Sequence, residues 1–296
     1  LRWSKKLLKV FGLQIKLLPE AKESSSIFGY TNLNQILKTS IPISGVMGDS
    51  QASIFANQCF NKGNTKITLG TGASILTNIG KQYTSKKNII TTLSYVYKNE
   101  PSYSYECLIN YAVATVSWLN NNLQIIKKPE ETNAIFKKTD SSNGVIFIPA
   151  FVGLSSPHWL PTCKGMIYGL TPSVNKNHII RSALESIAFQ IKDYVDDLEK
   201  NQKIVCNDIY IDGGIVSNTT FMQFLANTLK RKIYVTNFKD MSSYGSLVMG
   251  LLGMKIKKNL KDISIYKQKY STYLPNKNKF PDSYNEWKEV LKNFYL

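Results

Sequence analysis

Residues 43–74 read ISGVMGDSQASIFANQCFNKGNTKITLGTGAS and hold two apolar runs, each of which ends in a turn. The first run ends in Gly48-Asp49 and the second in Gly70-Thr71-Gly72. A carboxylate and a glycine turn at strand ends form the two halves of a phosphoryl-transfer site. The carboxylate accepts a proton from an attacking hydroxyl, and the turn offers backbone N–H groups and the Thr71 hydroxyl to phosphate oxygens. Each signal alone is weak, since Gly-Asp is commonly a helix N-cap and Gly-Thr-Gly a plain hairpin turn.

A third glycine turn strengthens this prediction. Asp212-Gly213-Gly214 follows the apolar run 209–211 and precedes a helical stretch from Asn218 to Leu229. Such a junction suits a nucleotide, because glycine allows close backbone approach and a helix N-terminus favours anions. We expect Asp212 itself to be chiefly structural.

Composition places the chain among globular proteins. It has 296 residues, of which 43% are hydrophobic, enough to bury a substantial core. No apolar run approaches the 18 or so residues of a membrane-spanning helix, so no membrane association is expected. The cysteines, at 59, 107, 163 and 206, lack the spacing of a zinc site. A reducing, cytoplasmic compartment fits this usage best.

The chain is strongly basic, with 37 Lys and Arg against 20 Asp and Glu and a net charge of +17. Such a charge raises the question of nucleic acid. However, nearly all the basic residues are lysines scattered through Asn- and Ile-rich sequence, whereas readers of nucleic acid rely on arginine for bidentate contacts. We therefore expect no nucleic-acid partner.

The order of the elements predicts an α/β fold. Strands are expected at 43–47, where the strand would be buried and carry Asp49 at its tip, and at 66–69, 74–79, 89–97, 103–109, 145–148, 208–211 and 232–235. Helices are expected over 112–123, 179–198, 218–229 and 243–254, with a long loop at 151–173. The alternation of strands and helices in the second half favours a sheet flanked by helices, and the first half reads as hairpins.

The ends of the chain differ from its middle. Residues 1–40 read as the end of something larger, with a short helix broken near Pro19. Residues 41–256 carry the glycine turns and form the main domain. Residues 257–296 are a basic, Tyr-rich tail, in which Trp287, Val290 and Leu291 predict a last helix docked on the core.

Several stretches together resemble one known family. They are PISGVMGD at 42–49, LGTG at 69–72, PAF at 149–151, SPHW at 156–159, the run from Asn177 to Ala188, and Asp212-Gly213-Gly214 with the helix from Asn218. In order and spacing they are similar to the FGGY family of carbohydrate kinases, and within it to the kinases that act on glycerol. The similarity extends from about residue 2 to Lys288.

The resemblance implies a fold and a reaction. Family members have two actin-like, ribonuclease H-like ATPase domains with the site between them, each a mixed sheet flanked by helices. The chain resembles the C-terminal domain preceded by the end of the first, so the N-terminal domain would be a missing partner. The implied reaction transfers the γ-phosphate of ATP, with Mg²⁺, to glycerol and forms sn-glycerol 3-phosphate. The isolated chain would then have negligible activity.

The resemblance also implies roles for individual residues. Asp49 would be the general base, Gly70 and Thr71 would face the transferring phosphate, Gly214 would lie under the nucleotide phosphates and ribose, and Asn218 would meet the adenine.

Four positions depart from the family pattern. Ser50 stands where glycerol kinases usually have Gln, and Ser74 stands where an aromatic residue lines the glycerol pocket. Near the nucleotide, Val113 and Ser117 occupy places often given to Gly and Gln. These departures leave open a kinase for another polyol or a ketose. A non-catalytic, actin-like nucleotide-binding module stays an alternative function. Whether the chain forms a homo-oligomer also stays open.

Overall fold

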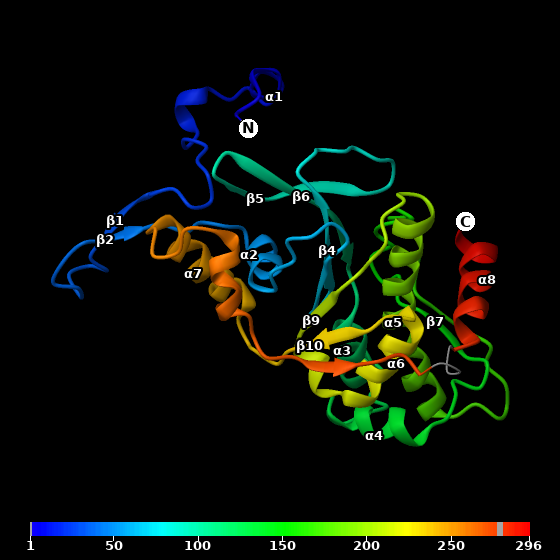
Figure 1. Cartoon of the computed structure of the whole chain (residues 1–296). Helices are drawn as coiled ribbons and strands as arrows, with labels where there is room; N and C mark the ends of the chain where they lie inside the picture. Colours follow the sequence, from blue (N-terminus) through cyan, green and yellow to red (C-terminus); the bar gives the residue numbers. More distant parts are fainter. Residues whose placement is uncertain (1, 277–280) are drawn as a thin grey trace.

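A mixed β-sheet forms the centre of the molecule in the computed structural model, which describes residues 2–276 and 281–296 (Figure 1). Within these residues the sheet has seven strands in the order β11-β10-β9-β3-β4-β6-β5. β3, β9 and β10 run parallel, and the other neighbours are antiparallel. The strands are β3 (Thr65–Leu69), β4 (Ala73–Gly80), β5 (Ile90–Tyr97), β6 (Glu100–Ile109), β9 (Ile209–Gly213), β10 (Ile233–Val235) and β11 (Ser271–Tyr273).

Alternation along the central strands gives the sheet two covered faces. Ile67, Ile75 and Ile211 are fully buried on one face within the main core. Their neighbours Leu76 and Tyr210 are buried on the other face, in a smaller cluster with Ile54. Because both faces are apolar, each is covered by helices.

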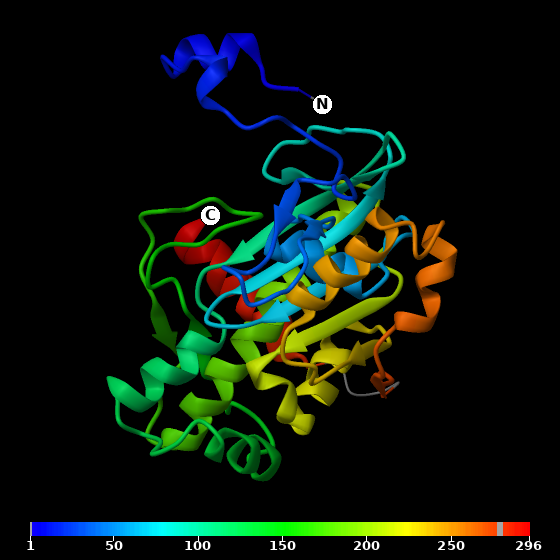
Figure 2. The ribbon, with the colours of Figure 1, turned by 90° about the vertical axis from the view of Figure 1, so that its left-hand side faces the viewer.

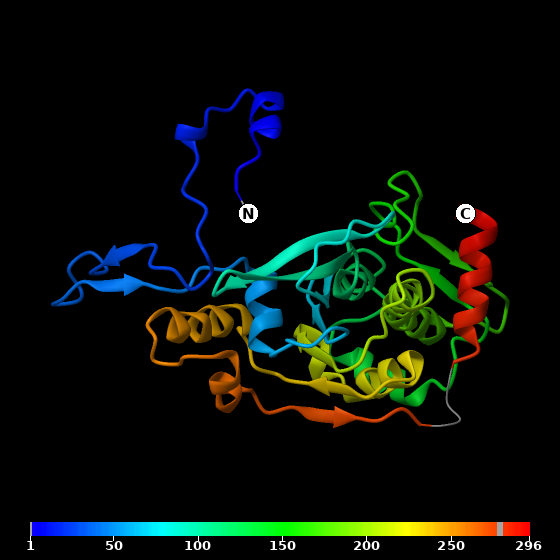
Figure 3. The same ribbon diagram turned by 45° about the horizontal axis from the view of Figure 1, so that its top comes forward.

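The helices form a layer on each side of the sheet (Figure 3). α2 and α7 pack together on one face, and α3, α4, α5, α6 and α8 contribute to the main core on the other. The bounds are α1 (Lys5–Val10), α2 (Asp49–Ala56), α3 (Val113–Asn121), α4 (Glu131–Lys138), α5 (Lys176–Lys200), α6 (Thr219–Leu229), α7 (Met241–Gly253) and α8 (Ser283–Tyr295), with 3₁₀ turns η1 (Ile15–Leu17), η2 (Gly214–Ser217) and η3 (Leu260–Tyr266).

α5 is the central helix of the main core. Asn175 caps its N-terminus by accepting from the Asn177 N–H at 2.9 Å, and the His178 ring accepts from the Asn175 N–H at 3.1 Å. This reciprocal capping pairs N–H groups that a helix start otherwise leaves open. His178 therefore has a structural role at the start of α5.

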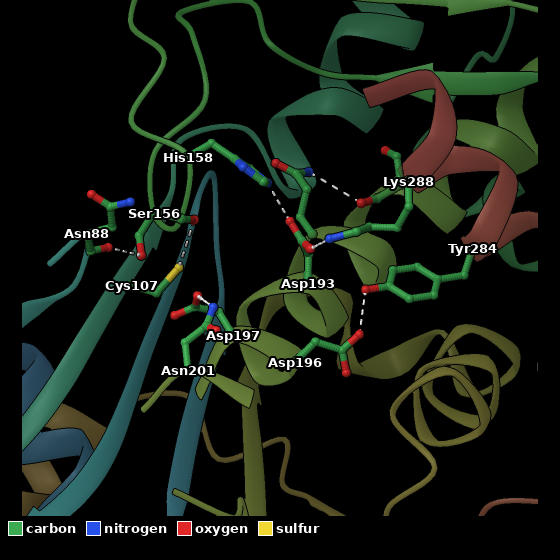
Figure 4. A network of polar contacts seen from close by, with 12 residues as sticks. Asn88, Cys107, Ser156, His158, Asp193, Asp196, Asp197, Asn201, Tyr284 and Lys288 are labelled. Carbon is green, nitrogen blue, oxygen red and sulfur yellow. Dashed lines mark hydrogen bonds and ion pairs between the residues drawn. The ribbon is translucent and has the colours of Figure 1, made fainter. Parts of the chain in front are cut away.

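A polar network joins α5 to the C-terminal helix and to the loop at 154–160 (Figure 4). His158 Nε2 lies 2.5 Å from Asp193 Oδ2, and Lys288 on α8 pairs with the other oxygen of Asp193. Burial alone would raise the pKa of Asp193, but the hydrogen bond and charge of His158, together with Lys288, hold that pKa below its ordinary value. The network thus fixes α8 against α5, as the expected docked helix requires.

The N-terminal segment stands apart from this body (Figure 2). α1 buries none of its residues. Further along, β1 (Gly29–Thr31) and β2 (Ile41–Ile43) form a separate two-stranded sheet. No helix within residues 2–276 and 281–296 is both long enough and apolar enough to cross a bilayer.

The strand expected at 43–47 is wrong. The strand there is β2, which ends at Ile43 and is exposed on alternate residues, and Asp49 opens helix α2 instead of ending a strand. After β2 the backbone packs so closely against α7 that no strand fits between them. A Cβ on Gly45 would lie 2.5 Å from the Gly250 nitrogen.

The loop expected at 151–173 is interrupted by a strand. β8 (Met166–Tyr168) pairs with β7 (Ile146–Ile148) in a second two-stranded sheet. β7 is the buried strand expected before Pro149, and α8 packs on it.

Candidate active site

Asp49 is held at the N-terminus of α2. Gly48 caps the helix with extended backbone, and Asp49 Oδ1 accepts from the Ser50 N–H at 2.6 Å. An acidic residue in the first turn favours the helix because of the helix dipole. The helix is anchored on α7, where Gly245 lies so near the Ala52 carbonyl that a Cβ would be 1.9 Å from its oxygen. The exposed carboxylate is therefore fixed at its backbone.

The turn at residues 70–72 connects the β3–β4 hairpin to the start of α3. The Gly70 N–H donates to the Gly72 carbonyl at 2.9 Å, so it is not free for a ligand. The Thr71 carbonyl accepts from the N–H groups of Ala112 and Ala114 at 3.1 and 3.0 Å, which caps α3. Thr71 itself is exposed and is the residue of the turn best placed to face a phosphate.

Asp49 and Thr71, distant in sequence, line one cavity of about 410 Å³. The parallel strands β3 and β9 end beside it, with Leu69 opposite Gly213. The carboxyl ends of parallel strands are where α/β sheets commonly bind ligands. Other lining residues are Ser50, Lys66, Thr68, Gly70, Gly72, Ala73, Ser74, Leu108, Ile109, Asn110 and Ser242.

Ser50 and Ser74, the two departures on the acceptor side, touch each other. Their hydroxyl oxygens lie 3.1 Å apart, joining the first turn of α2 to the start of β4. Two small hydroxyl side chains therefore stand together at the wall of the cavity. They leave more room and more polar surface than an amide and an aromatic ring would.

Lys66, which the sequence did not single out, is a buried lysine at the same cavity. Its residue is only 1% exposed on β3, and Leu76 lies between it and Glu106 in the register of the neighbouring strands. Burial lowers the pKa of Lys66, an effect that the nearby charges of Asp212 and Asp49 oppose. Burial likewise raises the pKa of Glu106, and the nearby Lys66 opposes this rise. The cavity thus contains charges of both signs.

Asp212 is structural, as its contacts indicate. It is 4% exposed, and its carboxylate accepts from Thr68 Oγ1 at 2.5 Å and Ser53 Oγ at 3.2 Å. The next residue, Gly213, has φ +114°, and a Cβ there would lie 2.2 Å from the Leu69 carbonyl oxygen. Only glycine fits at this position, where β9 lies against the end of β3, and its conformation lets the chain turn sharply from β9 toward α6.

Three residues expected at the nucleotide line a second cavity of about 310 Å³. These are Val113, Gly214 and Asn218. Asn218 caps α6 by accepting from the Phe221 N–H at 2.9 Å. Ser117 is not among the lining residues and is exposed on α3. The 70–72 turn connects the two cavities, since the Gly70 carbonyl accepts from the Val113 N–H at 3.2 Å.

Metal-binding clusters are absent from the part of the chain that the structure describes, where no three His, Cys, Asp or Glu side chains gather. The cysteines are free thiols, and burial raises the pKa of Cys206 to about 11.

A helix-flanked mixed sheet with a carboxylate and a glycine turn at one cavity defines an actin-like ATPase domain, and comparisons with known proteins agree. The family model described as the C-terminal domain of the FGGY family of carbohydrate kinases matches residues 65–254. The chain belongs to this family. A glycerol kinase from Psychromonas ingrahamii is 35% identical over 99% of the chain, and one from Vibrio vulnificus is 34% identical over 98%.

Solved structures give the same fold. A glycerol kinase from Plasmodium falciparum with ADP has a TM-score of 0.90 at 33% identity, over all of this chain and 60% of that one. A xylulose kinase from Rhodospirillum rubrum has a TM-score of 0.84 at 16% identity, over 99% of this chain and 60% of that one. The chain spans 58% of the length of both curated relatives.

Proposed function

We propose that this chain supplies the nucleotide-binding domain and the catalytic base of a kinase that phosphorylates glycerol with ATP to sn-glycerol 3-phosphate. The observation that carries the proposal is the shared cavity of Asp49 and Thr71, in a chain similar to glycerol kinases along its whole length. The free cysteines are consistent with a reducing cytoplasm.

Each residue has a defined task in this proposal. Asp49 accepts the proton of the attacking hydroxyl, and Thr71 offers its hydroxyl to the transferring phosphate, which Gly70 faces without a side chain. The phosphates and ribose lie along Gly214, whose own Cβ would meet nothing within 4 Å, and the base meets Asn218. Val113 flanks the nucleotide, whereas Ser117, one turn further along α3, does not line this cavity. Magnesium arrives with the nucleotide, so the phosphoryl donor is MgATP.

The acceptor pocket needs a second domain in this proposal. Residues 1–40 would belong to the end of the preceding domain, residues 41–256 to the C-terminal kinase domain, and residues 257–296 to a tail. Phosphoryl transfer depends on positioning and on excluding water, which closure of two domains supplies. The chain alone is therefore expected to be inactive.

The test uses the full-length protein and the variant Asp49→Asn. The variant should lose on the order of 10²-fold to 10⁴-fold in kcat with glycerol and MgATP, as expected for a missing general base. Nucleotide affinity should be unchanged, because Asp49 is exposed and its backbone is fixed by Gly48 and α7. Nucleotide binding by the wild type without turnover of any polyol would instead favour a non-catalytic module.

A second candidate, a kinase for a longer polyol or a ketose, is favoured by the Ser50–Ser74 contact. The two hydroxyls offer space and hydrogen bonds to a larger acceptor. A panel of polyols, pentuloses and hexuloses ranked by kcat/KM separates the candidates. If a larger acceptor is preferred, the double variant Ser50→Gln, Ser74→Phe should return the preference to glycerol.

A further inference from the structure

The second cavity contains two polar atoms that the protein leaves unpaired. Within residues 2–276 and 281–296, Asn218 Nδ2 and Asn133 Oδ1 are buried without a hydrogen-bond partner. Both residues line the same 310 Å³ cavity. A buried polar atom without a partner carries its full desolvation penalty, so two of them at one cavity point to a ligand that pairs with them.

The two unpaired atoms have opposite hydrogen-bonding character. The orientation of the Asn218 amide is fixed, because its oxygen accepts from the Phe221 N–H at 2.9 Å, and its free end is therefore a donor. The free atom of Asn133 is an acceptor. Asn218 lies at the start of α6 and Asn133 in the first turn of α4, so the cavity offers one donor and one acceptor from different elements.

The rest of the lining of this cavity is mixed. Val113 and Val116 on α3 and Ile215 after β9 contribute apolar side chains, and Glu130, Thr132 and Ser217 contribute polar ones. Gly214 adds no side chain, and a Cβ built on it would enter open space. Apolar side chains that cover the faces of a ring, with polar groups placed at its edge, are a common arrangement for binding an aromatic base.

We propose that Asn133 selects the base of the nucleotide by accepting a hydrogen bond from the exocyclic amino group of adenine, while Asn218 donates to a neighbouring ring nitrogen. This inference rests on the nucleotide-binding role proposed above. Adenine presents the N7 acceptor beside its N6 amino donor, whereas guanine presents two acceptors, N7 and O6. Guanine in the same pose would place O6 against the Asn133 oxygen.

Calorimetric titration of the chain tests the inference with three probes: ADP, GDP and purine riboside 5′-diphosphate, which lacks the amino group. The wild type should bind ADP roughly tenfold or more tightly than either analogue, the effect of one lost or opposed hydrogen bond. Asn133→Leu should lose most of the preference for ADP over the purine analogue. Asn133→Asp should keep it, because a carboxylate still accepts from the amino group.

Asn121→Leu is the matched control, an exposed asparagine on α3 that does not line the cavity. Asn133 is only partly buried, so both of its variants are expected to fold, which circular dichroism checks. An undiminished ADP preference in Asn133→Leu, or no preference in the wild type, overturns the role of Asn133 alone. If the wild type binds no nucleotide at all, both this inference and the proposed nucleotide site fail.

Discussion

Lys66 is a buried basic residue at the candidate site. It is buried at the cavity and lies on the same sheet face as Glu106, with Leu76 between them. Replacing it by Met keeps the aliphatic stem but removes the amino group that lowers the pKa of Glu106, so this already raised pKa should rise further. Carbon-detected NMR titration of the Glu106 carboxyl measures this, with the exposed Lys62→Met as control. An unchanged titration would mean that the two charges do not interact.

The lowered pKa of Asp193 makes the free energy of unfolding depend on pH in the acidic range. Its pKa is lowered in the folded state, so the unfolded chain binds a proton more readily, and the stabilisation is complete above the ordinary Asp value of about 4. It is lost as pH falls through the lower, folded pKa. Asp193→Asn should cost about 1–3 kcal/mol at pH 7, a difference that shrinks below about pH 4. Urea unfolding from pH 7 to 3 follows this, and Asp140→Asn, on an exposed residue, should show no such trend.

At the scale of elements, local pattern predicted most of the fold. The alternation around Gly70-Thr71-Gly72 gave the β3–β4 hairpin, and the apolar stripe after Asn175 gave α5. The error at 43–47 arose because an apolar run next to glycines was interpreted as a buried strand. Gly45 instead allows close contact with α7, a partner some 200 residues away that no local pattern shows.

Parts of the site were hidden from the sequence for a similar reason. Asp49 and Thr71 could be found because each adjoins a glycine turn. Lys66 could not, since a lysine in an alternating strand is typical of a solvent-facing position, and here α2 covers that face. Asn133 becomes meaningful only because α4 packs against α6 and brings it to the cavity of Asn218.

The docking of α8 gives a prediction about an element. Trp287 is 1% exposed, donates to the Phe147 carbonyl at 3.1 Å and packs beside Phe189 and Tyr284. Trp287→Ala should reduce the free energy of unfolding by about 3–5 kcal/mol, the usual cost of a large buried aromatic ring. Phe294→Ala, on the same helix but 56% exposed, should cost far less. Equal effects in denaturant titrations would show that α8 is not part of the cooperative core.

At the scale of the whole molecule, the segment before β1 carries apolar side chains that the central sheet and its helices do not cover. Val10 and Phe11 are each 70% exposed and Leu17 is 67% exposed, although single exposed apolar residues are common. Their number on one short segment is unusual for a surface that meets only water. In the proposed two-domain kinase, these side chains would contact the preceding domain.

Fusing the unmatched N-terminal part of the Psychromonas ingrahamii glycerol kinase to this chain tests the completeness of the site. The chain covers 58% of that relative, so the fusion restores a two-domain length. In the proposed two-domain kinase, positioning and water exclusion come from closure of both domains, so the fusion should phosphorylate glycerol at least on the order of 10³-fold faster than the chain alone. A coupled assay for ADP release measures both, and the fusion carrying Asp49→Asn controls for activity that does not use this cavity. Comparable turnover by the chain alone would mean that Asp49 and Thr71 form a complete site without a second domain.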